Sequence, residues 1–249
     1  MANIDLRGVV TRETKYGENS RILTVIAKDR GKVSVLASRA RSNRSGVLSA
    51  TQLFCYSDFE VFQGRENSLM RLNEGETIET FSGLRSSLDK MAYASYFCDI
   101  ANSLCVEGTE QNEILRLLLN AMSRLDKEDE SGALRIESVF LFRALREAGF
   151  APDCDGCACG DIEHIKWLIP TDGVFCCDKC LNGRVGIEVN PTLYNVITYI
   201  VNSNLASSFS FRLGENSLKY LAFVAEEYMR IQIEKDLKTL DYLRNVREL

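Results

Sequence analysis

Hydrophobic residues in the first eighty positions fall into short runs of β-branched and aromatic side chains, a pattern typical of β-strands. The five runs contain Val9 and Val10; Ile22, Val25 and Ile26; Val33, Val35 and Leu36; Phe59, Val61 and Phe62; and Leu69, Leu72 and Ile78. Turn-forming residues separate the runs at positions 16–19, 29–32 and 64–67, and one longer connection spans 38–51. Five short strands joined in this way predict a small barrel over residues 1–80. The oligonucleotide/oligosaccharide-binding (OB) type is the leading candidate, and an SH3-like barrel is the alternative.

After Ser82 the hydrophobic period changes from two to about 3.5, which indicates helices. Apolar positions at this spacing run from Leu84 to Cys105, Ile114 to Leu125, Leu134 to Ala148, Leu193 to Val201, and Leu218 to Met229 with a continuation toward Leu243. The third stretch is apolar on nearly every face, so we expect it at the centre of a core. Gly149 and Pro152 mark its end, and Asn190 followed by Pro191 marks the start of the next helix. The fold class is therefore α+β and multidomain, with an α-helical domain over residues 81–249 after the barrel.

Six of the nine cysteines lie in two short clusters within the segment 150–183. The pairs Cys154-x2-Cys157 and Cys177-x2-Cys180 are separated by nineteen residues, the spacing of two turns that close on one tetrahedral ion. Four thiolates complete the coordination of zinc and leave no open position. We predict one structural Zn²⁺ on Cys154, Cys157, Cys177 and Cys180, in a zinc-binding loop inserted into the helical domain, where the metal replaces a missing apolar core.

Two further cysteines, Cys159 and Cys176, keep the choice of ligands open, because either could replace a member of a pair. A loop of free thiols, an iron–sulfur cluster and a regulatory disulfide are the other readings of the clusters. The single histidine, His164, is expected to be an exposed residue of the loop. The remaining cysteines fall at buried positions of predicted elements and are expected to pack in the core: Cys55, Cys98 and Cys105.

Positive charge is concentrated between positions 28 and 44, where six basic residues accompany a single acid, Asp29. The basic residues are Lys28, Arg30, Lys32, Arg39, Arg41 and Arg44, and Arg12, Lys15 and Arg21 of the neighbouring hairpin extend the set. Residues 32–37 alternate so that one strand face packs and the other meets water. We predict that this surface binds nucleic acid through phosphate contacts, with weak sequence preference and steep salt dependence. Tyr16 is the best candidate for base stacking.

Composition restricts the class of protein further. The chain has 249 residues, of which 45% are hydrophobic and 26% charged, so it can bury a sizeable core. It has no apolar run of membrane-spanning length and no export signal at its start, so we expect a cytoplasmic protein with reduced cysteines and no membrane partner. The net charge of −5 argues against a surface that binds nucleic acid everywhere, although a local basic face is compatible with it.

The sequence lacks the motifs of common catalytic sites. It contains no GxxxxGK[ST] phosphate loop, no GxSxG, no HExxH and no dinucleotide fingerprint. With one histidine and no convincing pair of nucleophile and base, we expect no enzymatic activity and no small-molecule substrate.

Several segments, taken in order, resemble the RecO family of bacterial DNA repair and recombination mediators. The stretch GVVTRETKYGENSRILTVIAKDRGKVSVLASRARSNRS is similar to the opening of the family, and VFLFRALREAGFAPDCDGCACG is similar to the end of its third helix. DGVFCCDKC resembles the second half of its zinc motif, and EEYMRIQIEKDLKTLDYL resembles its closing helix. The sequence departs from the family pattern at Ser38, where a glycine is common, and at the additional Cys159.

The resemblance implies an OB-fold barrel, a helical domain and a zinc loop. It also implies binding to single- and double-stranded DNA, annealing of complementary strands, and recombinase loading on DNA coated by single-strand-binding protein. The implied partners are RecR and the C-terminal tail of single-strand-binding protein, and the implied location is the nucleoid. The competing hypotheses are a protein-interaction adaptor whose helical domain grips an acidic partner tail without binding DNA, and a zinc-ribbon transcription or RNA factor.

Overall fold

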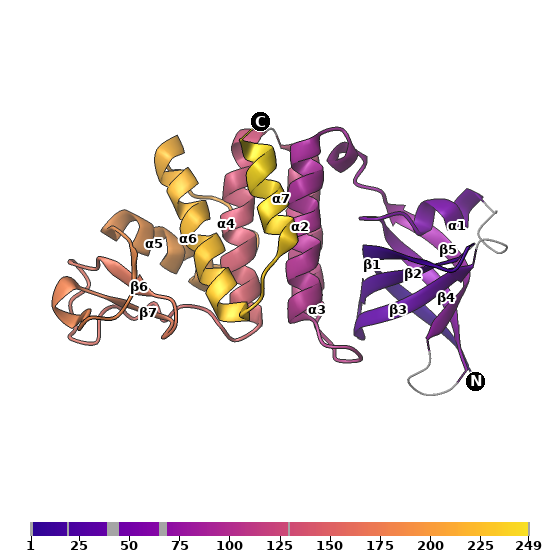
Figure 1. The fold of residues 1–249 in the computed structure, drawn as a ribbon, viewed down its shortest axis with the longest axis horizontal. Coiled ribbons are helices and arrows are strands. Elements are labelled where there is room, and N and C mark those ends of the chain that lie inside the picture. The colour runs from indigo at the N-terminus through magenta and orange to yellow at the C-terminus, as the bar shows by residue number, and fades with distance from the viewer. Residues whose placement is uncertain (1, 19, 39–44, 65–68, 129, 249) are drawn as a thin grey trace. The chain divides into compact units, whose positions relative to one another are not determined.

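The computed structural model describes residues 2–18, 20–38, 45–64, 69–128 and 130–248 (Figure 1). The chain forms two compact units. The first unit contains Met1–Lys127 together with Thr239–Leu249, and the second contains Glu128–Lys238. The first unit thus includes the N-terminal barrel, the helices that directly follow it, and the C-terminal helix.

Five strands form the closed barrel of the first unit, in the order β1-β2-β3-β5-β4. The strands are β1 (Ala2–Tyr16), β2 (Ser20–Ala27), β3 (Gly31–Ser38), β4 (Tyr56–Gln63) and β5 (Met70–Glu79). The first half of β1 pairs with β4 and its second half pairs with β2, so this long strand closes the barrel. Helix α1 (Ser45–Ala50) lies in the predicted long connection between β3 and β4. The predicted five-stranded N-terminal sheet is confirmed.

The period-two pattern of the sequence explains how the barrel fills its interior. Along β3, Val33, Val35 and Ala37 are buried while the alternate residues are partly exposed, as expected for a strand with one face in the core. The interior cluster is apolar throughout and includes Leu6, Val10, Leu23, Val25, Val33, Val35, Phe59, Val61 and Leu72. A bulge between Val10 and Arg12 changes the register, and the β1–β2 hairpin beyond it has both faces of β1 exposed.

Four helical elements complete the first unit: η1 (Ser82–Arg85), α2 (Leu88–Leu104), α3 (Asn112–Lys127) and α7 (Lys238–Arg247). Two predicted helices are each broken into two pieces. The first breaks at Ser86 and Ser87, where Ser87 takes an extended conformation before α2. The last breaks after Ile233, because Glu234 has a positive φ of 49° that no continuous α-helix accommodates.

The second unit contains helices α4 (Glu130–Glu147), α5 (Pro191–Asn202) and α6 (Glu215–Ile233). Helix α4 contacts both of the others and is buried on nearly all sides, as its sequence predicts. It ends where predicted, since Gly149 has φ 84° and the Phe150 N–H donates to the Leu145 carbonyl at 2.7 Å. The Asn190 side chain caps α5 by accepting from the Leu193 N–H at 2.9 Å.

A small sheet in the second unit carries the second cysteine cluster. Its strands β6 (Trp167–Ile169), β7 (Val174–Cys176) and β8 (Ile187–Glu188) pair in the order β7-β6-β8. The sequence did not predict these strands, because two or three residues are too few to show a hydrophobic period.

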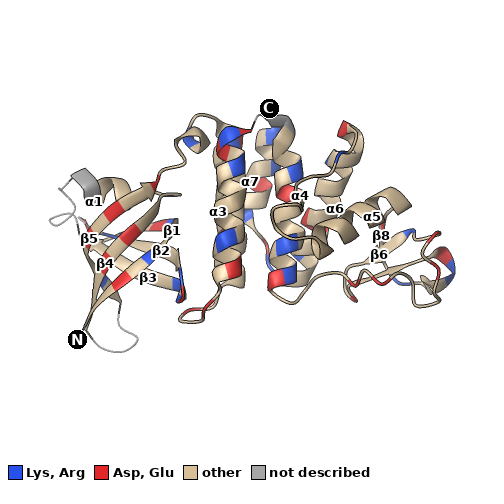
Figure 2. Cartoon of the chain, turned by 180° about the vertical axis from the view of Figure 1, so that it is seen from behind, with Lys and Arg blue, Asp and Glu red and all other residues tan. Residues whose placement is uncertain are grey.

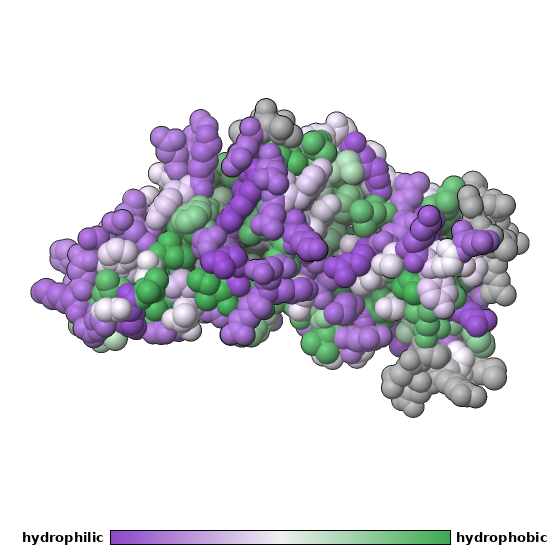
Figure 3. Space-filling model, in the orientation of Figure 1, coloured by the Kyte–Doolittle hydropathy of each residue, from purple (hydrophilic) through white to green (hydrophobic). Residues whose placement is uncertain are grey.

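The surface is mixed in polarity. The face drawn in Figure 3 shows hydrophobic residues in small groups between hydrophilic ones. Within the described ranges, no helix combines the length and the hydropathy needed to cross a bilayer.

Candidate metal centre and nucleic-acid interface

Four cysteine sulfur atoms converge in the second unit. The Sγ atoms of Cys157, Cys159, Cys177 and Cys180 all lie within 4.8 Å of one another. The Cys157 sulfur is 3.4 Å from that of Cys159 and 3.8 Å from that of Cys177. Each cluster contributes two of the four, and the antiparallel strands β6 and β7 lead into the second cluster. The tight turn between Cys157 and Asp161 includes Gly160 at φ 83°.

This arrangement fits a zinc ion in size and in donor chemistry. A tetrahedral ion with Zn–S bonds of about 2.3 Å requires sulfur–sulfur distances of about 3.8 Å. The Cys157–Cys177 and Cys159–Cys177 sulfur separations are both 3.8 Å, and none of the cysteines forms a disulfide. Four cysteine sulfurs with no other donor are typical of closed structural sites. The four residues could therefore hold one metal ion.

The pKa values of Cys157 and Cys180 fit the same conclusion. Burial raises the pKa of Cys157, but backbone N–H groups of Cys159 and Cys177 and neighbouring thiols outweigh it and lower the pKa to about 6. The thiols of Cys157 and its neighbours raise the pKa of Cys180 to about 12. The Cys157 thiolate thus forms readily, whereas neighbouring thiolates oppose the deprotonation of Cys180. A divalent cation bound among the sulfurs removes this opposition.

The set of converging sulfurs differs from the predicted ligands in one member. Cys157, Cys177 and Cys180 come together as predicted, but Cys159 occupies the place expected for Cys154. The Cys154 thiol instead donates to the Pro152 carbonyl at 3.3 Å, and its own carbonyl accepts from the Tyr194 hydroxyl at 2.7 Å. Cys154 thus fastens the segment to helix α5. The sequence offered Cys159 as an alternative, but spacing alone does not distinguish the two.

Asp178 stabilises the turn that carries the second cluster. Its carboxylate accepts from the Trp167 indole at 2.7 Å and from Lys166 at 3.1 Å, and these contacts, the indole first, lower the pKa of the Asp178 carboxyl. The His164 side chain is exposed and lies 3.1 Å from the Asp161 carboxylate, so it does not join the sulfur cluster. The three cysteines expected in the core are all buried: Cys55, Cys98 and Cys105.

Four of the predicted basic residues that the structure describes lie at two opposite ends of the β2–β3 ribbon. Lys28 and Arg30 occupy the turn between β2 and β3, whereas Lys15 and Arg21 flank the turn between β1 and β2. Strand β3 has eight residues, so it separates the two ends by about 23 Å at about 3.3 Å per residue. These two described groups therefore lie at separate places on the barrel.

The β2–β3 turn is docked against the loop between α2 and α3. The Asp29 N–H donates to the Asn112 side chain at 2.8 Å, and the Asn112 amide donates back to the Asp29 carboxylate at 2.7 Å. Gly31 approaches so closely that an added Cβ would lie 2.1 Å from the Thr109 carbonyl. Two exposed acids of this loop, Glu107 and Glu110, lie in the same docked region, since Glu107 bridges to Gly31 and Glu110 accepts from Asn112.

Three predicted cations already have partners in the first unit. Arg12 forms an ion pair with Asp99 of α2 at 2.9 Å, and Arg21 forms one with Glu13 at 3.0 Å. The Lys32 ammonium donates to the Asn102 carbonyl near the C-terminus of α2 at 2.9 Å, which is a favourable place for a cation.

Another three predicted cations lie outside the described residues: Arg39, Arg41 and Arg44. Within the part of the chain that the structure describes, no ion pair or side-chain hydrogen bond engages Lys15, Lys28 or Arg30.

We call the β1–β2 end of the ribbon the open end. It carries Lys15, Arg21 and the predicted stacking residue Tyr16, whose side chain is 53% exposed. Several outward residues of the adjoining strands have hydroxyl or apolar side chains: Thr14, Ser20, Ile22, Ser34, Leu36 and Ser38. Arg71 of β5 is exposed beside Leu36, through the parallel pairing of β3 with β5. Sequence reasoning missed Arg71, because a pairing between strands 35 residues apart leaves no local signal.

Acidic residues gather on another side of the barrel. Figure 2 shows them along β4 and β5. The barrel therefore differs in charge from one side to the other, although the whole chain is acidic.

Comparison with known proteins agrees with this architecture. The family description Recombination protein O N terminal matches residues 1–81, and Recombination protein O C terminal matches residues 85–241. A protein of Acetivibrio thermocellus named DNA repair protein RecO is 34% identical over 243 residues, which cover 96% of this chain and 95% of the relative. A protein of the same name from Alkaliphilus metalliredigens is 26% identical over 238 residues, covering 93% and 94%.

Fold and site together define a class of protein: a small closed barrel precedes helices, and a segment in which four cysteine sulfurs converge is inserted among them. The matches extend over both parts and nearly the whole length. The chain belongs to the RecO family.

Proposed function

We propose that this chain is a DNA repair and recombination mediator that binds single- and double-stranded DNA on an OB-type barrel and anneals complementary strands. The observation that carries the proposal is the open end of the barrel, where cations and an exposed tyrosine outnumber the acids Glu13 and Glu18 and adjoin the outward positions of β2 and β3, which contain no acid. The closed strand order and the helix between β3 and β4 support the OB assignment. The names of the relatives support the role in repair.

The open end suits a phosphate backbone better than the docked end. Lys15 and Arg71 are exposed and have no ion-pair partner among the described residues, and Tyr16 offers an aromatic face to a base. Arg39, Arg41 and Arg44 follow directly after Ser38, which pairs with Ser20 at this end. At the docked end, Asp29, Glu107 and Glu110 offset the charges of Lys28 and Arg30.

Annealing on such a surface requires no chemical step. Cations that contact the phosphates of two strands reduce the repulsion between them while the bases pair. The chain has no phosphate loop for a nucleotide, so this action is independent of ATP hydrolysis.

The cysteine segment has a structural role in this proposal. Cys157, Cys159, Cys177 and Cys180 bind one zinc ion, which holds the segment without taking part in a reaction. RecR and the tail of single-strand-binding protein are the proposed protein partners, and recombinase loading in the cytoplasm at the nucleoid is the proposed setting.

Fluorescence anisotropy with labelled single-stranded DNA at several salt concentrations tests the DNA-binding proposal. The logarithm of the association constant should fall linearly with the logarithm of salt concentration, with a slope of about −0.7 per phosphate contact. Absence of binding at low salt, together with intact binding of a RecR or single-strand-binding-protein tail, would favour the adaptor hypothesis. Equal affinity for RNA and DNA would favour the third hypothesis.

A further inference from the structure

Arg184 binds the main chain beside one of the four converging sulfurs. The chain reverses direction at Asn182 and Gly183, which have positive φ values of 49° and 74°, and the Arg184 N–H donates to the Leu181 carbonyl at 3.0 Å. The turn returns the Arg184 side chain to Cys180. Its Nη2 group donates to the Cys180 carbonyl at 2.7 Å, and its Nε group donates to the Leu181 carbonyl at 3.2 Å. One side chain outside the sulfur cluster thus holds the main chain that carries the Cys180 sulfur.

A third contact joins the same guanidinium to the small sheet. The Nη1 group of Arg184 forms an ion pair of 2.8 Å with Asp172, in the turn between β6 and β7. The carbonyl of the next residue, Gly173, accepts from the N–H of Asp153 at 2.7 Å, and Asp153 directly precedes the first cysteine cluster. Arg184 therefore connects the second cluster to the turn that also binds the chain leading into the first.

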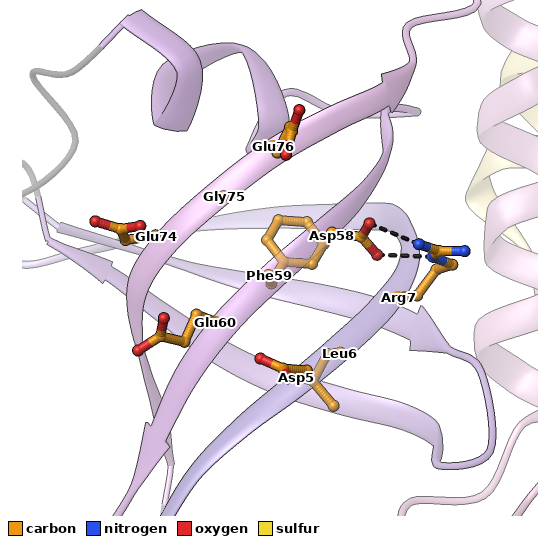
Figure 4. A pocket seen from close by; sticks show the side chains of 9 residues that line it. All are labelled: Asp5, Leu6, Arg7, Asp58, Phe59, Glu60, Glu74, Gly75 and Glu76. Carbon is orange, nitrogen blue, oxygen red and sulfur yellow. Dashed lines mark hydrogen bonds and ion pairs between the residues drawn. The ribbon is translucent and has the colours of Figure 1, made fainter.

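An ion pair on the barrel shows how different this arrangement is from a simple surface pair. Arg7 directs two hydrogen bonds of 2.7 and 2.8 Å to one carboxylate, that of Asp58 (Figure 4). Arg184 directs one group to a carboxylate and two to main-chain carbonyls. The planar guanidinium presents its donors in fixed directions, which a lysine ammonium cannot reproduce. Such contacts are expected of a residue that positions a turn.

Arg184 also places a positive charge next to the cluster. A divalent ion on four thiolates leaves two net negative charges, which cost free energy in a partly buried place unless cations offset them. The hydrogen bond to Asp172 is the main cause that raises the pKa of Arg184, and the charge of Cys180 raises it further. A second cation near this turn, Lys166, directs its ammonium group to the Asp178 carboxylate at 3.1 Å instead.

We infer that Arg184 is a positioning residue of the metal centre, which holds the Cys180 turn and offsets part of the negative charge of the metal-bound thiolates. The inference rests on the proposed zinc site and adds a residue that the spacing of the cysteines does not reveal. Removal of a group that hydrogen-bonds around metal ligands typically weakens metal binding by about 10–100-fold.

Three variants of the full chain test the inference against a common control. Arg184→Gln removes the charge and the guanidinium contacts, whereas Arg184→Lys keeps the charge and loses the contacts. Asp172→Asn removes an acid that faces Arg184 and leaves the two carbonyl contacts in place. Arg7→Gln is the matched control, because it removes the same group from an aspartate pair on the barrel. Competition with a chromogenic chelator measures zinc affinity, and cobalt(II) in place of zinc gives a sulfur-to-metal charge-transfer band in the absorption spectrum.

The charge-transfer band distinguishes the charge of Arg184 from its contacts. A cation beside a thiolate lowers the energy of the sulfur electrons, so loss of the cation should shift the band to longer wavelength. Arg184→Gln should show this shift and bind zinc about 10–100-fold more weakly than the unaltered chain. Arg184→Lys should bind zinc with intermediate affinity, and its band should stay near that of the unaltered chain. Asp172→Asn should shift the band to shorter wavelength, which tests the inference even if the Arg184 variants do not fold. Arg7→Gln should match the unaltered chain in both measurements.

Unchanged zinc affinity in Arg184→Gln would overturn the inference, while the proposed metal centre would stand. Weaker binding with a charge-transfer band that moves in neither Arg184→Gln nor Asp172→Asn would show a purely structural role and would also overturn it. If the unaltered, reduced chain binds neither zinc nor cobalt, the proposed metal centre fails and the inference fails with it.

Discussion

The barrel and the cysteine segment of this RecO-family protein are stabilised in different ways. The barrel surrounds a continuous apolar cluster built from alternate residues of five strands. The cysteine segment has strands of only two or three residues, and its two clusters meet through four sulfur atoms. The barrel core is thus built by side chains of five strands, whereas the cysteine segment combines a few buried apolar side chains, among them Leu168, Ile169 and Phe175, with the four converging sulfurs. We expect changes at the four cysteines to have the largest effects.

Metal removal should separate the two regions most clearly. A Cys177→Ser, Cys180→Ser variant should bind no zinc, because two of the four sulfurs are lost, and structural zinc contributes about 10 kcal/mol or more to the folding of comparable small sites. Hydrogen exchange should become fast over residues 154–188, while the barrel strands remain protected. Elemental analysis of the reduced protein should find one zinc per chain before the change and none after it. Loss of protection in the barrel as well would contradict the comparison.

Single substitutions sharpen the assignment of the ligands. A Cys159→Ser variant should lose most of its zinc affinity, whereas Cys154→Ser should retain the metal, because the Cys154 thiol contacts the Pro152 carbonyl instead of the cluster. Competition with a chromogenic chelator measures both variants under the same conditions. If Cys154→Ser lost its zinc affinity and Cys159→Ser retained it, the ligands would be the four that the spacing predicts, with Cys154 in place of Cys159.

A single methyl group tests the barrel side of the comparison. Gly31→Ala should destabilise the first unit by more than about 1–2 kcal/mol, because a residue with φ 61° is strained and its Cβ would collide with the Thr109 carbonyl. Gly17→Ala is the matched control, since Gly17 has φ 62° and nothing lies within 4 Å of its added Cβ. Urea denaturation of both variants separates the strain from the collision. Equal losses would show that the contact with the α2–α3 loop contributes nothing.

The smallest expected effect concerns acid pH and the Arg7–Asp58 pair on the barrel. Hydrogen bonding to Arg7 lowers the pKa of Asp58 below its usual value of 3.8. The pair therefore stabilises the fold above that value, and its contribution is lost as pH falls through the lower pKa of the folded state. Because both side chains are about half exposed, an Asp58→Asn variant should lose only a little stability at neutral pH. The difference from the unaltered chain should shrink as the pH falls below the usual aspartate pKa of 3.8, as measured by thermal denaturation.

The extent to which sequence predicts this molecule depends on how local each signal is. Alternation in β3, the cap at Asn190 and the stop at Gly149 are encoded within a few residues, and each was predicted correctly. The choice between Cys154 and Cys159 depends on contacts with Pro152 and Tyr194, which spacing does not reveal.

Charges illustrate the same limit on a larger scale. Lys28 and Arg21 are close in sequence, yet they lie toward opposite ends of one ribbon. Arg71 and Leu36 are distant in sequence and adjacent in the barrel. A run of basic residues in the sequence therefore predicts a basic surface, but the strand pairing determines where on the barrel each basic side chain lies.

The central claim is that DNA binds at the open end of the barrel, and one salt-resolved comparison tests it most directly. A Lys15→Gln, Arg71→Gln variant and a Lys28→Gln, Arg30→Gln variant each remove two positive charges, one pair from the open end and one from the docked end. By anisotropy with single-stranded DNA, the first should bind more weakly with a slope shallower by about 0.7 per lost phosphate contact, and the second should match the unaltered chain. Equal losses in both variants, or a loss only in the second, would contradict the account.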